Sequence, residues 1–294
     1  MQITVLTATY NRAHLLGDLY ESLCRQTLKD FVWIIIDDGS SDNTRQLCEK
    51  WQQGNSGFKI EYYYKENAGK NRAINLGVAR VKTPYTMIID SDDYLVDDAI
   101  EKMNKAIDSI FGMKAVAGVS GMRGESVITS LNQLQQDYID ASNLERKELG
   151  INRDCCEVYK TELLRAHPFM PWEGEKFVPE EVVWNQIALE GYKLRWFNFV
   201  TCIVRYQEEG LTKGSWGLLK NNPMGYAMMF NHRLLYEKSF QKMCYYTIQM
   251  ISCTILGHHM NYLLKSNNKF LTMLLFPIGG GVAVRRYMQL VRKR

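Results

Sequence analysis

The first half of the chain alternates short apolar runs with segments whose apolar residues recur at helical spacing. Runs at residues 3–7, 32–36, 60–64 and 85–89 predict strands, and the unbroken run 32–36 is typical of a strand covered on both faces. Leucines at positions 15, 16, 19 and 23 predict a helix after the first strand, and further helices are expected through Trp51 and over residues 73–79. This alternation predicts an α/β fold with a mainly parallel central sheet and right-handed crossovers.

The pattern changes twice further along. Residues 116–205 are less regular and predict a mixed α and β half, and from residue 206 the chain turns helical and ends basic. Polar residues interrupt the apolar stretch 245–264. The run 270–284 is shorter than the roughly 20 residues of a spanning helix, and Pro277 and Gly279 to Gly281 are expected to break it. Both stretches are therefore predicted to pack or to lie at an interface, not to span a membrane.

The composition is that of a globular protein and does not indicate a nucleic-acid-binding, zinc-binding or disulfide-rich one. Apolar residues make up 46% and charged residues 23% of the chain, an ordinary globular mix, and a net charge of +4 is too small to indicate nucleic acid. Seven cysteines occur without a CxxC pair, so neither a zinc site nor a disulfide framework is indicated. No signal peptide is recognised at the start, and a cytoplasmic protein is expected.

Polar side chains follow three of the predicted strands. Tyr10-Asn11, Asp37-Asp38 and the cluster Asp90-Ser91-Asp92-Asp93 all stand where a strand ends. In parallel sheets these ends gather ligands in one crevice. Three carboxylates within four residues repel one another unless a cation compensates them, and oxygen ligands without His or Cys suit Mg²⁺ or Mn²⁺ held together with substrate phosphates. The alternative is a solvated loop that caps a helix.

Asp37-Asp38-Gly39-Ser40 carries the same ambiguity. It is either an ordinary strand-to-helix turn or a carboxylate that accepts hydrogen bonds from a nucleoside. The stretch 67–72 is not a phosphate loop, because Tyr64 stands where that motif needs Gly and Asn71 where it needs Ser or Thr. A GxGxxG fingerprint is also missing from the first turn, which removes the main support for ATPases and dehydrogenases. Lys70 and Arg72 either neutralise donor phosphates or belong to a solvated loop.

Together these segments resemble the family-two inverting glycosyltransferases of the GT-A fold. The resemblance runs through residues 3–12, Gln26-Thr27, residues 36–42, then Asn67, Gly69, Ala73, Asn75 and Gly77, and closes with residues 90–94. The usual Pro of the opening motif is Ala8 here. The resemblance implies a catalytic domain over residues 1–205, with a nucleotide-sugar half at 1–115 and an acceptor half at 116–205, followed by a helical, basic extension at 206–294.

The resemblance also implies roles for individual side chains. Asp92 would be the chief ligand of a divalent metal, Mn²⁺ or Mg²⁺, with Asp90 beside it. The residues expected on the nucleotide side are Thr9, Tyr10, Asn11, Asp38, Asn67, Lys70, Arg72, Asp90 and Ser91. The donor implied is a nucleotide-diphosphate sugar, most commonly a uridine one, and the product is expected in cell-surface polysaccharide synthesis.

An inverting transferase needs a base for the acceptor hydroxyl. In the family this is usually an acid in a dipeptide that opens a helix, and Pro179-Glu180-Glu181 fits such a first turn. Glu181 aligns better with the family's base, and Glu180 stays open. The alternative is that both acids merely favour the helix N-terminus.

Two further expectations concern the second half. Gly210-Leu211-Thr212 resembles a segment that would order over the donor diphosphate. The basic residues after Met260, next to the apolar stretch 270–276, are expected to contact anionic lipid, which suits a lipid-linked or saccharide acceptor; packing on the catalytic domain is the alternative. A nucleotidyltransferase and a non-catalytic nucleotide-sugar binder remain as other functions.

Overall fold

The computed structural model describes residues 1–124, 137–151, 155–204 and 215–292. In chain order its elements are β1 Ile3–Thr9, α1 Ala13–Arg25, β2 Phe31–Asp37, α2 Thr44–Gln53, β3 Lys59–Tyr64, α3 Lys70–Arg80, β4 Tyr85–Ile88, β5 Tyr94–Leu95, α4 Ala99–Asp108, β6 Val116–Arg123, β7 Tyr138–Ala141, β8 Cys155–Lys160, α6 Thr161–Ala166, α7 Glu181–Leu189, β9 Lys193–Ile203, α8 Ser215–Asn221, α9 Pro223–Arg233, α10 Phe240–Leu256, the 3₁₀ helix η1 Met260–Lys265 and α11 Lys269–Arg292.

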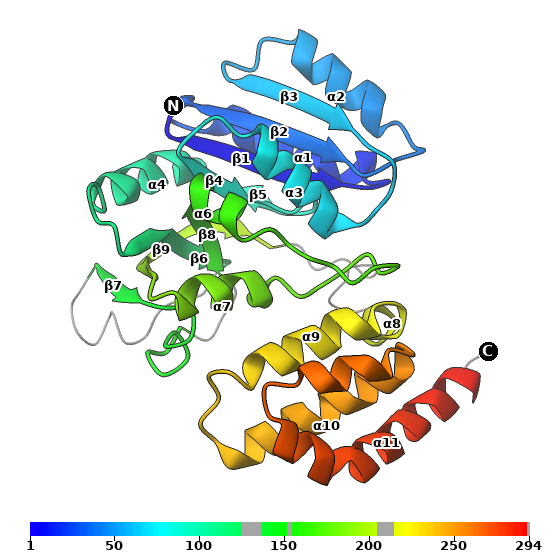
Figure 1. Cartoon of the computed structure of the whole chain (residues 1–294). Coiled ribbons are helices and arrows are strands. Elements are labelled where there is room, and N and C mark those ends of the chain that lie inside the picture. The colour runs from blue at the N-terminus through cyan, green and yellow to red at the C-terminus, as the bar shows by residue number, and fades with distance from the viewer. Residues whose placement is uncertain (125–136, 152–154, 205–214, 293–294) are drawn as a thin grey trace. The chain divides into compact units, whose positions relative to one another are not determined.

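The chain forms two compact units (Figure 1). The first comprises Met1–Phe169 and Val183–Gln207 and holds the sheet. The second comprises Met170–Val182 and Glu208–Arg294 and holds the C-terminal helices. The short segment Met170–Val182 therefore belongs with the helices, although it lies between strands of the sheet in sequence.

The sheet of the first unit has the order β3-β2-β1-β4-β8-β6-β9-β5, with β7 paired to β9. Strands β3, β2, β1 and β4 are parallel, as predicted. Strand β8 is antiparallel to both its neighbours, which makes the second half of the sheet mixed. The strand order reverses between β1 and β4, and in open α/β sheets ligands bind at such a switch point, beyond the carboxyl ends of the strands.

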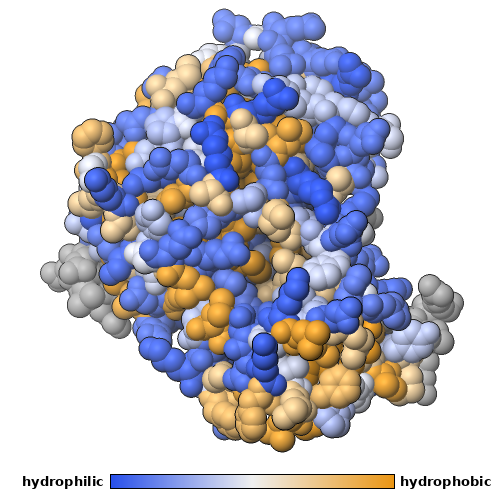
Figure 2. Space-filling model, in the orientation of Figure 1, coloured by the Kyte–Doolittle hydropathy of each residue, from blue (hydrophilic) through white to orange (hydrophobic). Residues whose placement is uncertain are grey.

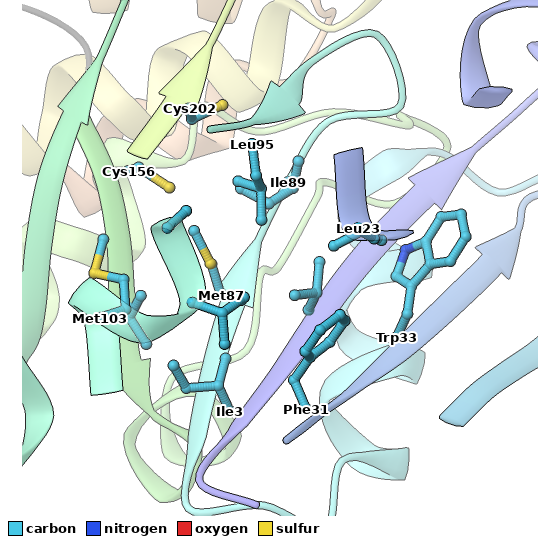
Figure 3. Close-up of a cluster of buried hydrophobic side chains, with 14 of the residues drawn as sticks. Ile3, Leu23, Phe31, Trp33, Met87, Ile89, Leu95, Met103, Cys156 and Cys202 are labelled. Atoms are coloured by element: carbon cyan, nitrogen blue, oxygen red, sulfur yellow. The ribbon is translucent and has the colours of Figure 1, made fainter. Parts of the chain in front are cut away.

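Alternate residues of the central strands face opposite sides of the sheet. On one side Ile3, Phe31 and Trp33 pack with Leu23 of α1 and Met103 of α4 in a buried cluster (Figure 3). On the other side α3 lies against β1 and β2, so closely that a Cβ on Gly77 would come within 2.2 Å of Leu6 Cδ1. Helices thus cover both faces of β1 and β2, which explains their unbroken apolar runs.

The second unit is built on α10, which contacts both α9 and α11 (Figure 1). The expected break of the apolar run at Pro277 and the following glycines is wrong, because α11 continues through them from Lys269 to Arg292. A Cβ on Gly279 would lie 2.6 Å from Cβ of Ile251, so the glycine lets α11 approach α10 closely. Tertiary packing here outweighs the poor helix propensity of these residues. Within the described residues, no helix combines the length and apolarity needed to cross a membrane.

Candidate functional site at the carboxyl ends of β1, β2 and β4

The loops after β1 and β2 are joined through Asn11. Its backbone N–H donates to Ser40 Oγ over 2.8 Å, and its Oδ1 accepts from the Ser41 N–H over 2.8 Å. Asn11 holds a positive φ of 53°, a conformation that Asn tolerates better than most residues. Asn11, predicted on the nucleotide side, therefore holds the loops after β1 and β2 together. Tyr10 beside it is 49% exposed and presents its ring to solvent.

Thr9 ends β1 and is only 3% exposed. Its Oγ1 is buried and has no hydrogen-bond partner among the described residues. A buried hydroxyl without a partner costs about 1–3 kcal/mol. Such an atom at the end of a central strand is a candidate contact for a bound polar ligand.

Asp37, the last residue of β2, and Asp38 after it are both buried, and both accept hydrogen bonds. Asp37 accepts from Tyr62 Oη over 2.7 Å and from the Ser40 N–H over 2.8 Å, which makes it part of the turn. Asp38 accepts from the backbone N–H groups of Ala68 and Gly69 over 2.9 and 2.7 Å. Asp38 thereby fastens the loop after β3 to the end of β2.

Lys65 and Asn67 complete this attachment. Lys65 pairs with Asp38, and Asn67 Nδ2 donates to the backbone oxygen of Asp38 over 2.8 Å. Gly69, with a φ of 97°, then turns the chain into α3. Arg72, expected near the donor phosphates, donates to Ala68 O over 3.0 Å. Side-chain and backbone contacts within the chain therefore fix the loop between β3 and α3.

Each aspartate of the 90–93 loop has its own cation from a different element. Lys70 Nζ, at the start of α3, lies 2.7 Å from Asp90 Oδ1. Arg12 Nη1, after β1, lies 2.8 Å from Asp92 Oδ2 and 3.5 Å from Ser91 Oγ. Arg123 Nη1, at the end of β6, lies 2.8 Å from Asp93 Oδ2. These cations compensate the repulsion among the three carboxylates.

The carboxylates differ in surroundings. Asp93 is 2% exposed, and its N–H closes the turn on Asp90 O over 3.2 Å, so it supports the loop from inside. Burial alone would raise the pKa of Asp90, but Lys70 and Arg123 outweigh burial and lower that pKa to about 2. Asp90 is therefore charged at neutral pH, as a metal ligand must be.

The donor set fits a divalent metal only in part. In the part of the chain that the structure describes, no group of three or more His, Cys, Asp or Glu side chains could hold a metal ion. Asp90 and Asp92 provide two carboxylates with no soft ligand nearby. That set suits an ion such as Mg²⁺, which binds through one or two carboxylates and takes its remaining ligands from phosphates and water.

Glu180 and Glu181 belong to the second unit. Glu181 opens α7, and its two carboxylate oxygens accept from Nε and Nη2 of Arg233, each over 2.6 Å. Burial alone would lower the pKa of Arg233, but Glu181 outweighs burial and raises it. Both carboxylate oxygens of the predicted base are thus bound by one guanidinium, in a two-pronged ion pair.

The segment that carries Glu181 is attached to α9 at a second point. Glu175 is 8% exposed and accepts from the N–H groups of Met224 and Gly225 over 2.7 and 2.8 Å, at the first turn of α9. Burial is the largest influence on Glu175 and raises its pKa. A Cβ on Gly225 would lie 2.2 Å from Phe177 O, so segment and helix are in close contact.

Sequence reasoning missed the partners of the predicted residues. The sequence alone indicates no role for Arg12, Arg123, Arg233 or Glu175. The carboxylate cluster indicates that cations lie nearby, but not which ones. Arg123 is 30 residues from Asp93 in sequence and Arg233 is 52 residues from Glu181, so sequence spacing could not identify either partner. The expected Gly210-Leu211-Thr212 segment lies outside the described residues.

Comparison with known proteins identifies the class. The family model described as glycosyl transferase family 2 matches residues 4–167. This span includes β1 from Thr4 onward, all of β2 to β4 and every predicted nucleotide-side residue. The chain belongs to glycosyl transferase family 2.

Individual relatives agree with this. The chain is 27% identical over 175 residues to the teichoic acid poly(glycerol phosphate) polymerase of Staphylococcus epidermidis, covering 56% of this chain and 23% of that one. It is 28% identical over 181 residues to the putative glycosyltransferase EpsH of Bacillus subtilis, covering 59% and 51%. The chain thus spans about half or less of the length of these curated relatives.

Solved structures match the fold more completely. TarS 1-349 of S. aureus in complex with UDP-GlcNAc has a TM-score of 0.62 and 14% identity, covering 98% of this chain and 89% of that one. The mannosyltransferase PcManGT of Pyrobaculum calidifontis, in complex with GDP-Man and Mn²⁺, has a TM-score of 0.58 and 15% identity, covering 96% and 80%. The likeness extends through the C-terminal helices and confirms the predicted GT-A fold.

Proposed function

We propose that this chain is an inverting, metal-dependent glycosyltransferase that moves a sugar from a nucleotide-diphosphate sugar to a saccharide or lipid-linked acceptor. The observation that carries the proposal is the paired charge at the switch point of the sheet, where Asp90 meets Lys70 and Asp92 meets Arg12. A diphosphate with a divalent ion carries the same two kinds of charge. It can therefore exchange with these pairs without leaving a charge uncompensated.

On the nucleoside side, Tyr10 offers an exposed ring on which a base can stack. Thr9 Oγ1 lacks a partner in the described part of the chain and can bond to a polar atom of the ligand. Asp38 has a positioning role, because its carboxylate holds the loop that carries Asn67 in place. A uridine diphosphate sugar is the donor we propose, and the UDP-GlcNAc bound to TarS supports that choice.

At the diphosphate, Asp90 and Asp92 would hold the divalent ion, Mn²⁺ or Mg²⁺. When bound, the ion neutralises charge that develops on the leaving diphosphate. Arg12, after β1, and Lys70 and Arg72, in the first turn of α3, would bind phosphate oxygens of the donor. Ser91, 3.5 Å from Arg12, keeps that guanidinium over the loop. The Mn²⁺ bound to PcManGT supports the assignment of the metal.

At the acceptor, Glu181 takes the proton of the attacking hydroxyl. The oxygen attacks the anomeric carbon on the side opposite the diphosphate, which leaves with the electrons of the broken bond. A carboxylate oxygen can accept this proton, and the two bonds from Arg233 fix the orientation of the Glu181 carboxylate. Glu180 is the alternative base in the same turn.

The acceptor and setting are proposed from the relatives. A teichoic acid polymerase among them supports a cell-surface polysaccharide as the product. An acceptor of that kind, when lipid-linked, is reached from the cytoplasmic face of a membrane, which suits peripheral contact through the basic C-terminal region.

The decisive experiment measures nucleotide-diphosphate release from UDP sugars with Mn²⁺ or Mg²⁺. We expect release that a chelator removes and that Asp92→Asn lowers by at least about a hundredfold. Asp97→Asn is the matched control, since this exposed aspartate pairs with Arg25 on the surface. Release of pyrophosphate with a nucleotidyl product would instead identify a nucleotidyltransferase. Donor binding without turnover, with every acceptor supplied, would identify a binding protein.

A further inference from the structure

Helix α11 has two different sides. Leu271, Thr272 and Ala283 are buried, and Gly279 lies against Ile251 of α10. The other side is apolar as well but exposed. Its large side chains and their exposed fractions are Phe270 68%, Met273 74%, Leu274 58%, Ile278 54%, Val284 58%, Tyr287 60% and Met288 50%.

These side chains share one face of α11, because they follow one another at helical spacing, with the exposed Gly281 standing between Ile278 and Val284. Leu264 of η1, 75% exposed, and Tyr245 of α10, 53% exposed, add to the apolar surface of the same unit. Figure 2 shows apolar residues gathered over the helical unit at the lower end of the view. A contiguous apolar surface of this kind marks an interaction site, because each large apolar side chain gains about 1.5–3 kcal/mol on full burial.

The charge of this part of the chain selects the partner. No Asp or Glu occurs after Glu237, whereas the same stretch contains Lys238, Lys242, Lys265, Lys269, Arg285, Arg286, Arg292, Lys293 and Arg294. Two copies meeting through this surface would bring like charges together. An anionic surface is the complementary partner, and each Lys or Arg near such a membrane contributes about 1 kcal/mol.

The distribution of charge along α11 also fits a helix that lies flat. Residues 270–284 contain no charged side chain, and basic residues flank them at Lys269 and at Arg285. At about 1.5 Å per residue this stretch is roughly 22 Å long, shorter than the ~30 Å hydrocarbon core. Apolar residues at the middle with cations at the ends are suited to the boundary between headgroups and acyl chains.

We propose that the exposed side of α11 lies on an anionic phospholipid bilayer, with Phe270, Met273 and Leu274 inserted among the acyl chains and Lys269 and Arg285 at the lipid phosphates. This sharpens the membrane contact of the proposed function and in that sense rests on it. Lipid binding by the whole chain needs neither donor nor turnover. The two ideas therefore fail separately.

The experiment is flotation of the full chain with vesicles of phosphatidylcholine alone and of phosphatidylcholine with phosphatidylglycerol. We expect flotation with the anionic vesicles only, weakened by high salt because exposed charges are screened. The triple variant Phe270→Ser, Met273→Ser, Leu274→Ser is expected to bind at least about tenfold more weakly. Phe111→Ser, at a residue 91% exposed in the first unit, is the matched apolar control and should float as the unchanged chain does.

Charge is tested separately with Lys269→Glu and Arg285→Glu together, against Lys82→Glu and Lys114→Glu, two exposed lysines of the first unit. The first pair should lower binding at least about tenfold and the control pair should not.

Circular dichroism checks that each variant keeps its helices. Equal flotation with neutral vesicles, or a dimer in light scattering that the triple variant abolishes, would overturn the proposal. Donor hydrolysis without flotation would overturn it while leaving the transferase intact.

Discussion

Arg233, the last residue of α9, donates from Nε and Nη2 to Oε1 and Oε2 of Glu181, the first residue of α7, over 2.6 Å each. Both residues belong to the unit that holds the C-terminal helices. The side chain proposed as the base is therefore positioned by the helical extension. The proposed mechanism thus gives the helical extension a positioning role that its sequence does not indicate.

The identity of the base is tested by exchanging each acid for its amide. Glu181→Gln is expected to lower the transfer rate by about 10²–10⁴-fold, because it removes the proton acceptor. Donor affinity, measured by calorimetry, should stay within about twofold. Glu180→Gln is the control with the same chemical change one residue away. A dead Glu180→Gln beside an active Glu181→Gln would assign the role to Glu180.

Removing the partner of the base should also slow transfer. Arg233→Met leaves Glu181 without its two donors, so the carboxylate loses its fixed orientation. We expect kcat to fall at least about tenfold with little change in the donor KM, and Arg233→Lys to recover only part, because a lysine cannot grip two oxygens in a fixed fork. In the double variant with Glu181→Gln, the loss should be no greater than in Glu181→Gln alone. Additive losses would show that Arg233 acts elsewhere.

Arg12 is expected to compete with the metal when no donor is bound. Its guanidinium lies 2.8 Å from Asp92, where it repels a divalent cation and engages one of the ligand oxygens. Arg12→Gln should therefore bind Mn²⁺ more tightly in the absence of nucleotide, by several-fold in paramagnetic resonance titrations, while donor turnover falls. Arg25→Gln, at a surface pair with Asp97, should change neither. Weaker Mn²⁺ binding by Arg12→Gln would contradict this.

Two glycines provide a test of the packing under the site. Gly77→Ala would place its Cβ 2.2 Å from Leu6 Cδ1 and 3.1 Å from Ile36 Cγ1, both in the core, and should destabilise the fold by about 1–3 kcal/mol. Gly17→Ala, in the helix α1, meets no atom within 4 Å and should stabilise by about 0.5–1 kcal/mol. Urea denaturation gives both values. Equal effects would mean that the close approach of α3 to the sheet is absent.

The nucleotide half could be predicted because its signals are local. Four apolar runs place β1 to β4, and polar residues at their ends follow from the strands alone. The long-range partners could not be predicted. The buried Asp93 requires a cation, but nothing near residue 93 in the sequence indicates Arg123. The two side chains are neighbours only because of the position of β6 in the sheet. Pro277 misled for a similar reason, since its helix depends on contact with α10, not on local propensity.

The attachment of Met170–Val182 to α9, through Glu175 and Arg233, has a consequence for building hybrids of related enzymes. A graft that exchanged only the C-terminal helices would separate Glu175 from the backbone it caps and Glu181 from its guanidinium. A graft that exchanged residues 170–182 together with the helices would keep both attachments. The piece of this chain that can be inherited or transplanted intact is therefore discontinuous in sequence, and a single crossover point cannot deliver it.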